Sequence, residues 1–126
     1  MDGMDCCGKQ RQRFVELARL QALRSTMEHR LGCVIVHDGV VIAAGFNHVF
    51  RHMTHRYSMH AEVATLFKAK KKHRRLLQDC SMYVVRIGRL GDLRLSKPCA
   101  DCHAEIEACR VRCTYYSVTD EPGRPI

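Results

Sequence analysis

The sequence contains no tryptophan, only three prolines and only 6% aromatic residues. Proteins that hold single-stranded nucleic acid usually stack the bases on aromatic side chains, so this scarcity argues against a stacking platform. No segment approaches the roughly 20 consecutive apolar residues that a membrane helix needs, and the N-terminus has no hydrophobic signal region. We therefore expect an intracellular protein, cytoplasmic or nuclear, that does not bind membranes.

Length and composition indicate one globular domain. A chain of 126 residues can bury one core but is too short for two, and 46% apolar with 27% charged residues is typical of globular proteins. We expect a single domain over residues 1–126, with an irregular N-terminal end at 1–8 and a short C-terminal tail at 119–126.

Basic residues outnumber acidic ones by 21 to 13, which gives a formal net charge of +8. They concentrate in a run from Lys68 to Arg75 and in a looser group from Arg86 to Lys97. A surface of this charge favours phosphate-bearing partners, either free nucleotides or nucleic acid. The first run is also typical of a helix C-terminus, where the helix dipole favours cations.

The first half of the chain predicts a helix followed by a β-hairpin. Apolar residues recur every three or four positions over 9–27, without proline or glycine, which indicates a helix. Two apolar, β-branched runs at 33–36 and 40–46 flank Asp38-Gly39, the signal of a tight hairpin turn.

The second half predicts two more helices and two more strands. A polar loop over 47–59 precedes a helix over 60–72, and Pro98 suits the first turn of another helix. The other expected elements are a strand at 82–87, a loop at 88–97 and a strand at 113–118. This order of elements indicates an α/β fold with helices packed against one sheet.

Two of the eight cysteines form a Cys-x-x-Cys pair, Cys99 and Cys102, with His60 upstream. In an intracellular chain this arrangement is typical of metal binding, because thiolates stay reduced and available. Both half-motifs open predicted helices, where the dipole stabilises a thiolate and the x-x spacing returns Cys102 to the same point. Three protein ligands leave the fourth tetrahedral zinc position to water, the mark of a catalytic site.

Glu62 follows His60 by two residues, so its side chain is directed beside the metal and not onto it. A carboxylate there can take a proton from a zinc-activated water and return protons to a substrate. Of the other cysteines, we expect Cys33, Cys109 and Cys113 to be buried as small apolar side chains.

His60-Ala61-Glu62 followed by Pro98-Cys99-x-x-Cys102 resembles the zinc-dependent cytidine and deoxycytidylate deaminase superfamily. The resemblance extends over about residues 31–118 and implies a three-layer sandwich, with a mixed sheet of four or five strands and helices on both faces. It further implies one catalytic Zn²⁺ per chain, bound by His60, Cys99 and Cys102, with Glu62 as the proton shuttle.

The resemblance also implies substrate contacts. Asn47 closes a stretch similar to the family's Gly-x-Asn and would contact the sugar, and the Ala61 backbone amide would donate to the base. Arg51 and Arg56 are candidate phosphate contacts, and Tyr57 is a candidate for stacking. Many members continue beyond the last strand expected here, so we expect a homo-oligomer in which a partner subunit can complete the pocket.

Three functions fit these features. The first is hydrolytic deamination of cytosine to uracil in a free nucleoside or nucleotide, which the compact size and few aromatics favour. The second is deamination of cytosine or adenine in single-stranded DNA or RNA, which the charge of +8 favours. The third is a catalytically idle zinc-binding relative that acts as a binding module; Glu62 argues against it, because a structural zinc site needs no free carboxylate.

Overall fold

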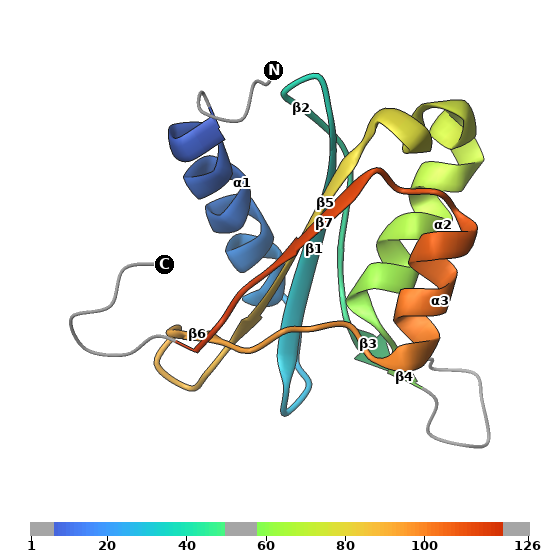
Figure 1. Cartoon of the computed structure of the whole chain (residues 1–126). Coiled ribbons are helices and arrows are strands. Elements are labelled where there is room, and N and C mark those ends of the chain that lie inside the picture. The colour runs from blue at the N-terminus through green and yellow to red at the C-terminus, as the bar shows by residue number, and fades with distance from the viewer. Residues whose placement is uncertain (1–6, 50–57, 120–126) are drawn as a thin grey trace.

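One five-stranded sheet separates α1 from α2 and α3 in the computed structural model, which describes residues 7–49 and 58–119 (Figure 1). The elements, in chain order, are α1 (Cys7–Ala22), β1 (Arg30–His37), β2 (Val40–Phe46), β3 (His48–Val49), β4 (Ser58–Met59), α2 (Ala61–His73), the 3₁₀ helix η1 (Arg74–Asp79), β5 (Ser81–Ile87), β6 (Leu93–Arg94), α3 (Ala100–Ala108) and β7 (Cys113–Tyr116). This arrangement confirms the predicted three-layer α/β fold.

The sheet is mixed. Strand β1 pairs antiparallel with β2 and with β5, and the far edge of β5 pairs with β7 in parallel and with β6 in antiparallel orientation. The predicted hairpin is confirmed at the β1–β2 turn, where Asp38 and Gly39 both have positive φ, 48° and 77°. Such values suit the tight hairpin turns that match the twist of the strands.

Alternation along the strands divides the core into two clusters. Cys33, Ile35, Met82 and Val84 belong to the cluster between the sheet and the helices α2 and α3. Their neighbours along the strands, such as Val34 and Val85, pack with α1 on the opposite face. Since side chains of a strand alternate between faces, successive residues of β1 and of β5 belong to opposite layers.

Helix α1 ends earlier than predicted. It ends at Ala22, and its buried residues include Phe14, Ala18 and Ala22, whereas Leu20 is exposed. A Cβ at Gly32 would run into the backbone of α1, so the helix lies directly on β1, and only small side chains fit between them. The helix begins at Cys7, and most of the N-terminal end expected to be irregular at 1–8 lies outside the described residues.

The predicted loops contain short strands. Strands β3 and β4 pair within the polar segment at 47–59, and β6 lies within the segment at 88–97. The last strand ends at Tyr116, two residues earlier than expected. Residues 1–6, 50–57 and 120–126 are outside the described part. In the described part no helix combines the length and apolar character needed to cross a membrane.

Candidate metal centre

Two of the predicted ligands stand immediately before helices, as the sequence indicated. His60 precedes α2 and Cys99 precedes α3, both with extended backbone, φ −67° and −69°. Their carbonyl groups accept the first helical hydrogen bonds, from the Ala64 N–H at 2.9 Å and the His103 N–H at 2.8 Å. Each of the two helices therefore begins directly after a ligand. Neither His60 nor Cys99 caps its helix with a side chain.

The three ligand atoms converge. His60 Nδ1 lies 3.0 Å from Cys102 Sγ and 3.7 Å from Cys99 Sγ, and all three atoms lie within 4.8 Å of one another. Tetrahedral zinc with Zn–S near 2.3 Å and Zn–N near 2.0 Å separates its ligand atoms by about 3.5 Å. One histidine and two thiols at these separations fit one zinc ion, and no other such group occurs within 7–49 and 58–119.

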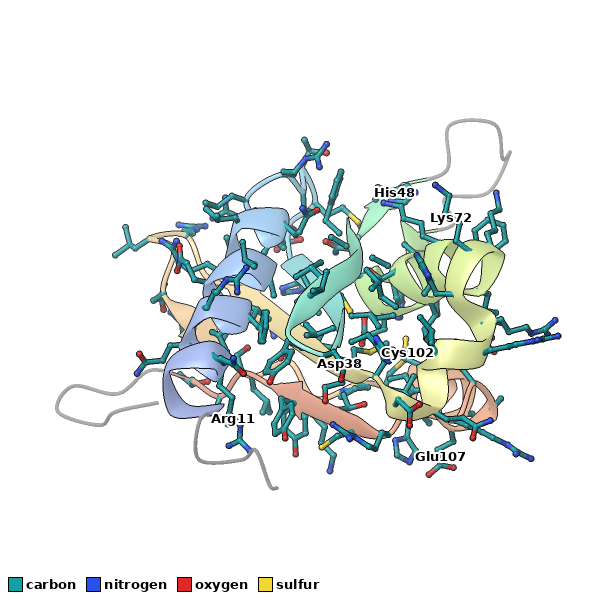
Figure 2. All side chains as sticks on the ribbon, turned by 90° about the horizontal axis from the view of Figure 1, so that it is seen from above. Arg11, Asp38, His48, Lys72, Cys102 and Glu107 are labelled. Atoms are coloured by element: carbon teal, nitrogen blue, oxygen red, sulfur yellow. The ribbon has the colours of Figure 1, made fainter. Side chains whose placement is uncertain are left out.

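The centre lies at the boundary between solvent and core. His60 and Cys99 are exposed, whereas Cys102 is 1% exposed. Figure 2 shows Cys102 inside the outline of the molecule, while Arg11 and Glu107 project at its periphery. One side of the metal position is therefore open to a small molecule, and the other side rests on the core.

Glu62 lies in the first turn of α2 and is 3% exposed. Burial raises the pKa of its carboxyl group, against the opposing effects of the nearby His60 and of a hydrogen bond with Cys102. Burial also raises the pKa of the Cys102 thiol, and the Glu62 carboxylate raises it further. Glu62 and Cys102 are thus close neighbours in a poorly solvated place, where a bound cation would favour the charged form of both.

A layer of small residues supports this turn of α2 from below. Thr65, fully buried, donates a 2.7 Å hydrogen bond from Oγ1 to the Ala61 carbonyl oxygen. A Cβ at Gly45 of β2 would lie 2.7 Å from that same Oγ1, so α2 packs directly on the strand. Sequence reasoning did not identify Thr65, and it used Gly45 only as the glycine of the Gly-x-Asn stretch, although a glycine inside a strand often marks a close backbone approach.

The cysteine predictions are confirmed only in part. Cys33 is fully buried in β1, and burial raises the pKa of its thiol, with a further increase from Glu62. Cys109 and Cys113 are half-buried, contrary to the prediction. Cys109 follows the end of α3 and Cys113 begins the outer strand β7, so neither position is covered on all sides.

Two of the predicted substrate contacts, Asn47 and Ala61, are buried. Asn47 is 5% exposed; its Oδ1 accepts a hydrogen bond from Leu31 N at 2.9 Å, and its Nδ2 donates one to His29 O at 2.6 Å. Ala61, the first residue of α2, is fully buried. Contact of these two residues with a sugar or base stays a prediction, and Arg51, Arg56 and Tyr57 lie outside the described residues.

Comparisons with known proteins agree with this geometry. The model of the family described as "Cytidine and deoxycytidylate deaminase zinc-binding region" matches residues 8–118. A deoxycytidylate (dCMP) deaminase from the cyanophage S-TIM5 is similar in structure, with 20% identity, a TM-score of 0.67, and coverage of 86% of this chain and 82% of that one. No curated protein matches the chain.

Two further solved structures are similar. RibD from Acinetobacter baumannii has 25% identity and a TM-score of 0.62, over 86% of this chain and 28% of that chain. A deaminase of A-to-I editing at the wobble position of transfer RNA has 27% identity and a TM-score of 0.58, over 85% and 75%. Since the family model spans nearly the whole described chain and its metal ligands assemble in the structure, this chain belongs to the zinc-dependent cytidine and deoxycytidylate deaminase family.

Proposed function

We propose that this protein hydrolyses the exocyclic amino group of a cytosine base, giving uracil and ammonia, with Glu62 as the proton shuttle. The observation that supports this most strongly is the burial of Glu62 beside the three-ligand group. A buried carboxylate has a large desolvation cost, and a zinc site that only stabilises a fold has no use for one. This argues against the idle-relative alternative.

The reaction needs a water, a proton shuttle and donors to the base. When a zinc ion is bound by His60, Cys99 and Cys102, it lowers the pKa of a water toward about 7. Glu62 takes a proton from the attacking water, whose oxygen bonds to C4 of the base. The carboxyl group delivers this proton to the ring nitrogen. It then takes a second proton from the hydroxyl group now on C4 and passes it to the amino group, so the C4=O bond forms as the C4–N bond breaks and ammonia leaves.

The start of α2 contributes orientation and polarity. The Ala61 amide is one of the first-turn N–H groups that have no acceptor within the helix, so it is available to a carbonyl oxygen of the base. The positive end of the helix dipole favours negative charge on the Glu62 carboxylate and on the ligands beside it. Burial raises the pKa of Glu62, which makes its carboxylate a better proton acceptor near neutral pH.

The test compares the zinc-loaded protein with Glu62→Gln and with a control, Glu107→Gln, which neutralises an exposed carboxylate. Ammonia release is followed with cytidine, deoxycytidine, their monophosphates, adenosine, and cytosine- or adenine-containing single strands. Loss of the shuttle should lower kcat by about 10²–10⁴-fold, with the zinc content unchanged. Activity of Glu62→Gln within tenfold of wild type would exclude the shuttle role, and no ammonia from any substrate would exclude deamination.

Two substrate classes fit the same centre. The small number of aromatic residues favours cytosine in a free nucleoside or nucleotide. The similarity to the transfer-RNA deaminase, together with a groove lined by four arginines and two acidic residues, favours a base in a single strand. A homo-oligomeric state and an intracellular location stay predictions.

A further inference from the structure

A groove of about 830 Å³ lies at the end of the sheet where β1 begins and β5 ends. Arg30, Arg86, Arg89 and Arg94 all line it, and we call it the arginine groove. Its walls are the segment before β1 and the turn between β5 and β6, which lie side by side at this end of the sheet.

One row of paired residues leads from the groove to Asn47, which follows β2. The N–H of Asn47 donates to Leu31 O, Leu31 is the register partner of Arg86, and Arg86 is the partner of Arg94. Register partners on adjacent strands share a face of the sheet. Because Leu31 packs against the cluster beneath α2 and α3, Arg86 and Arg94 lie on the same face as the metal ligands.

Among residues 7–49 and 58–119, only one of the four arginines of this groove forms an ion pair with a carboxylate. Arg86 donates a 2.7 Å hydrogen bond to His29 Nδ1, and Arg30 donates a 2.9 Å hydrogen bond to Gly88 O, so neither bond is to a carboxylate. Arg94 pairs with Asp92 at 2.8 Å. Within 7–49 and 58–119 no carboxylate lies at ion-pair distance from Arg30, Arg86 or Arg89. The lining holds four arginines and two acidic residues, Glu28 and Asp92.

The turn that carries Arg89 is held in place. The Gly91 N–H donates to Gly88 O at 3.1 Å, the Gly88 N–H donates to Asp92 O at 2.8 Å, and Gly91 has a φ of 81°. Arg19 of α1 donates a further bond to Gly91 O at 3.2 Å. Because these bonds already order the backbone of the turn, the turn itself adds little entropic cost when an anion binds.

We propose that the arginine groove binds the phosphates of a single-stranded polynucleotide while one base of that strand occupies the metal centre. The inference rests on the proposed function and names its substrate class. Planar guanidinium groups without acidic partners are well suited to phosphate, which they can bind through two parallel hydrogen bonds. Leu90, 95% exposed at the tip of the turn, adds apolar surface for a neighbouring base.

The length of this row of residues favours a polynucleotide over a single nucleotide as the ligand. Three strand-to-strand spacings of about 4.8 Å separate Asn47 from Arg94, so the row is some 14 Å long. The phosphate of a mononucleotide is attached to the sugar itself and cannot contact both ends of such a row. Successive phosphates of a strand can follow it, and their bases need not stack on aromatic rings for this contact.

The test measures binding of fluorescein-labelled 12-mers of thymidine and of uridine to the zinc-loaded protein, by fluorescence anisotropy between 50 and 200 mM salt. These probes contain no amino group to remove, so binding is separated from turnover. The test variant is Arg86→Gln/Arg89→Gln, and the control Arg74→Gln/Arg75→Gln removes the same charge from the exposed η1 segment. The loss of two phosphate contacts should make the negative slope of log K (the association constant) against log salt concentration less steep by about 1.4.

We expect the test variant to bind about tenfold more weakly and the control within twofold of wild type. Arg89→Gln alone should reproduce part of the loss, and it alters only an exposed side chain, so a folding defect cannot explain it. Equal binding by wild type and the test variant, or an equal loss in the control, would overturn the proposal.

A second arm distinguishes a strand from a mononucleotide. For each substrate, kcat/KM of Arg86→Gln/Arg89→Gln is compared with that of wild type. The factor by which the variant is slower should be at least five times larger for a 12-mer with one cytosine than for dCMP. Equal falls would assign the groove to the phosphate of a mononucleotide and refute the polynucleotide proposal. Groove-dependent binding without any ammonia release would refute the proposed function and leave the phosphate groove supported.

Discussion

Gly45→Ala tests whether the close packing of α2 on β2 determines the geometry of the metal centre. The added Cβ would lie 2.7 Å from Thr65 Oγ1 and 3.5 Å from Thr65 N. Real Cβ atoms essentially never approach a heavy atom within 3.0 Å, so the helix or the strand must move by at least a few tenths of an ångström. Thr65 cannot turn away cheaply, because it is fully buried and its Oγ1 is bonded to Ala61 O at 2.7 Å.

The cost follows from these contacts. Overpacking a well-filled core costs about 1–3 kcal/mol, and loss of the Thr65 hydrogen bond adds about 1 kcal/mol. Replacing glycine inside a strand returns roughly 0.5–1 kcal/mol, because glycine loses more conformational freedom on folding. We expect Gly45→Ala to lower the free energy of unfolding by about 2–3 kcal/mol. Because the displaced turn carries Glu62 and follows His60, zinc affinity should fall as well.

Urea unfolding of four proteins isolates the contact: wild type, Gly45→Ala, Thr65→Ala and the double variant. In the Thr65→Ala background the new methyl group occupies vacated space, so we expect a coupling free energy of about 1–2 kcal/mol between the two positions. If Gly45→Ala costs the same in both backgrounds, the contact with Thr65 is not the cause. If zinc affinity is unchanged while stability falls, the packing does not position the ligands.

Two other predictions concern the hydrogen bonds of Asn47 and the binding of zinc. Asn47→Ala removes an acceptor for Leu31 N and a donor to His29 O, and should lower the free energy of unfolding by about 2 kcal/mol; a urea-unfolding loss under 0.5 kcal/mol would contradict this. Zinc at 100 times its Kd should stabilise the fold by about 2.7 kcal/mol, so a chelator should lower Tm by roughly 10 °C in a thermal scan. Cys102→Ser should abolish that difference, and a variant that keeps it would refute the ligand assignment.

The metal centre was predictable because its signals are local. Pro98 before Cys99, the x-x spacing to Cys102, and the helical period that follows His60 all act within one or two turns of helix. The β1–β2 hairpin was equally accessible, since Asp38 and Gly39 satisfy a turn geometry that few residues adopt. In each case the neighbouring residues alone determine the backbone.

The packing of α1 and the arginine groove could not be predicted, because both depend on contacts between residues far apart in the sequence. Helix α1 buries Ala18 and Ala22 because Gly32, ten residues beyond the helix, has no side chain to keep the backbone of α1 away from β1. In the sequence, Arg86 and Arg94 are only two members of a basic group. Their alignment with Leu31 comes from strand register, which the order of residues does not reveal.

An ion bound at the metal centre joins residues that are far apart in the sequence, and this restricts the conformational freedom of the unfolded chain. His60 is separated from Cys99 by 39 residues and from Cys102 by 42, so an ion that joins them closes a long loop. By analogy with a disulfide, closing a loop of this length removes about 4 kcal/mol of conformational freedom from the unfolded chain. The closed loop includes β5, the turn with Arg89, and β6. Metal occupancy at one end of the sheet therefore also cross-links the segment that holds Arg86, Arg89 and Arg94.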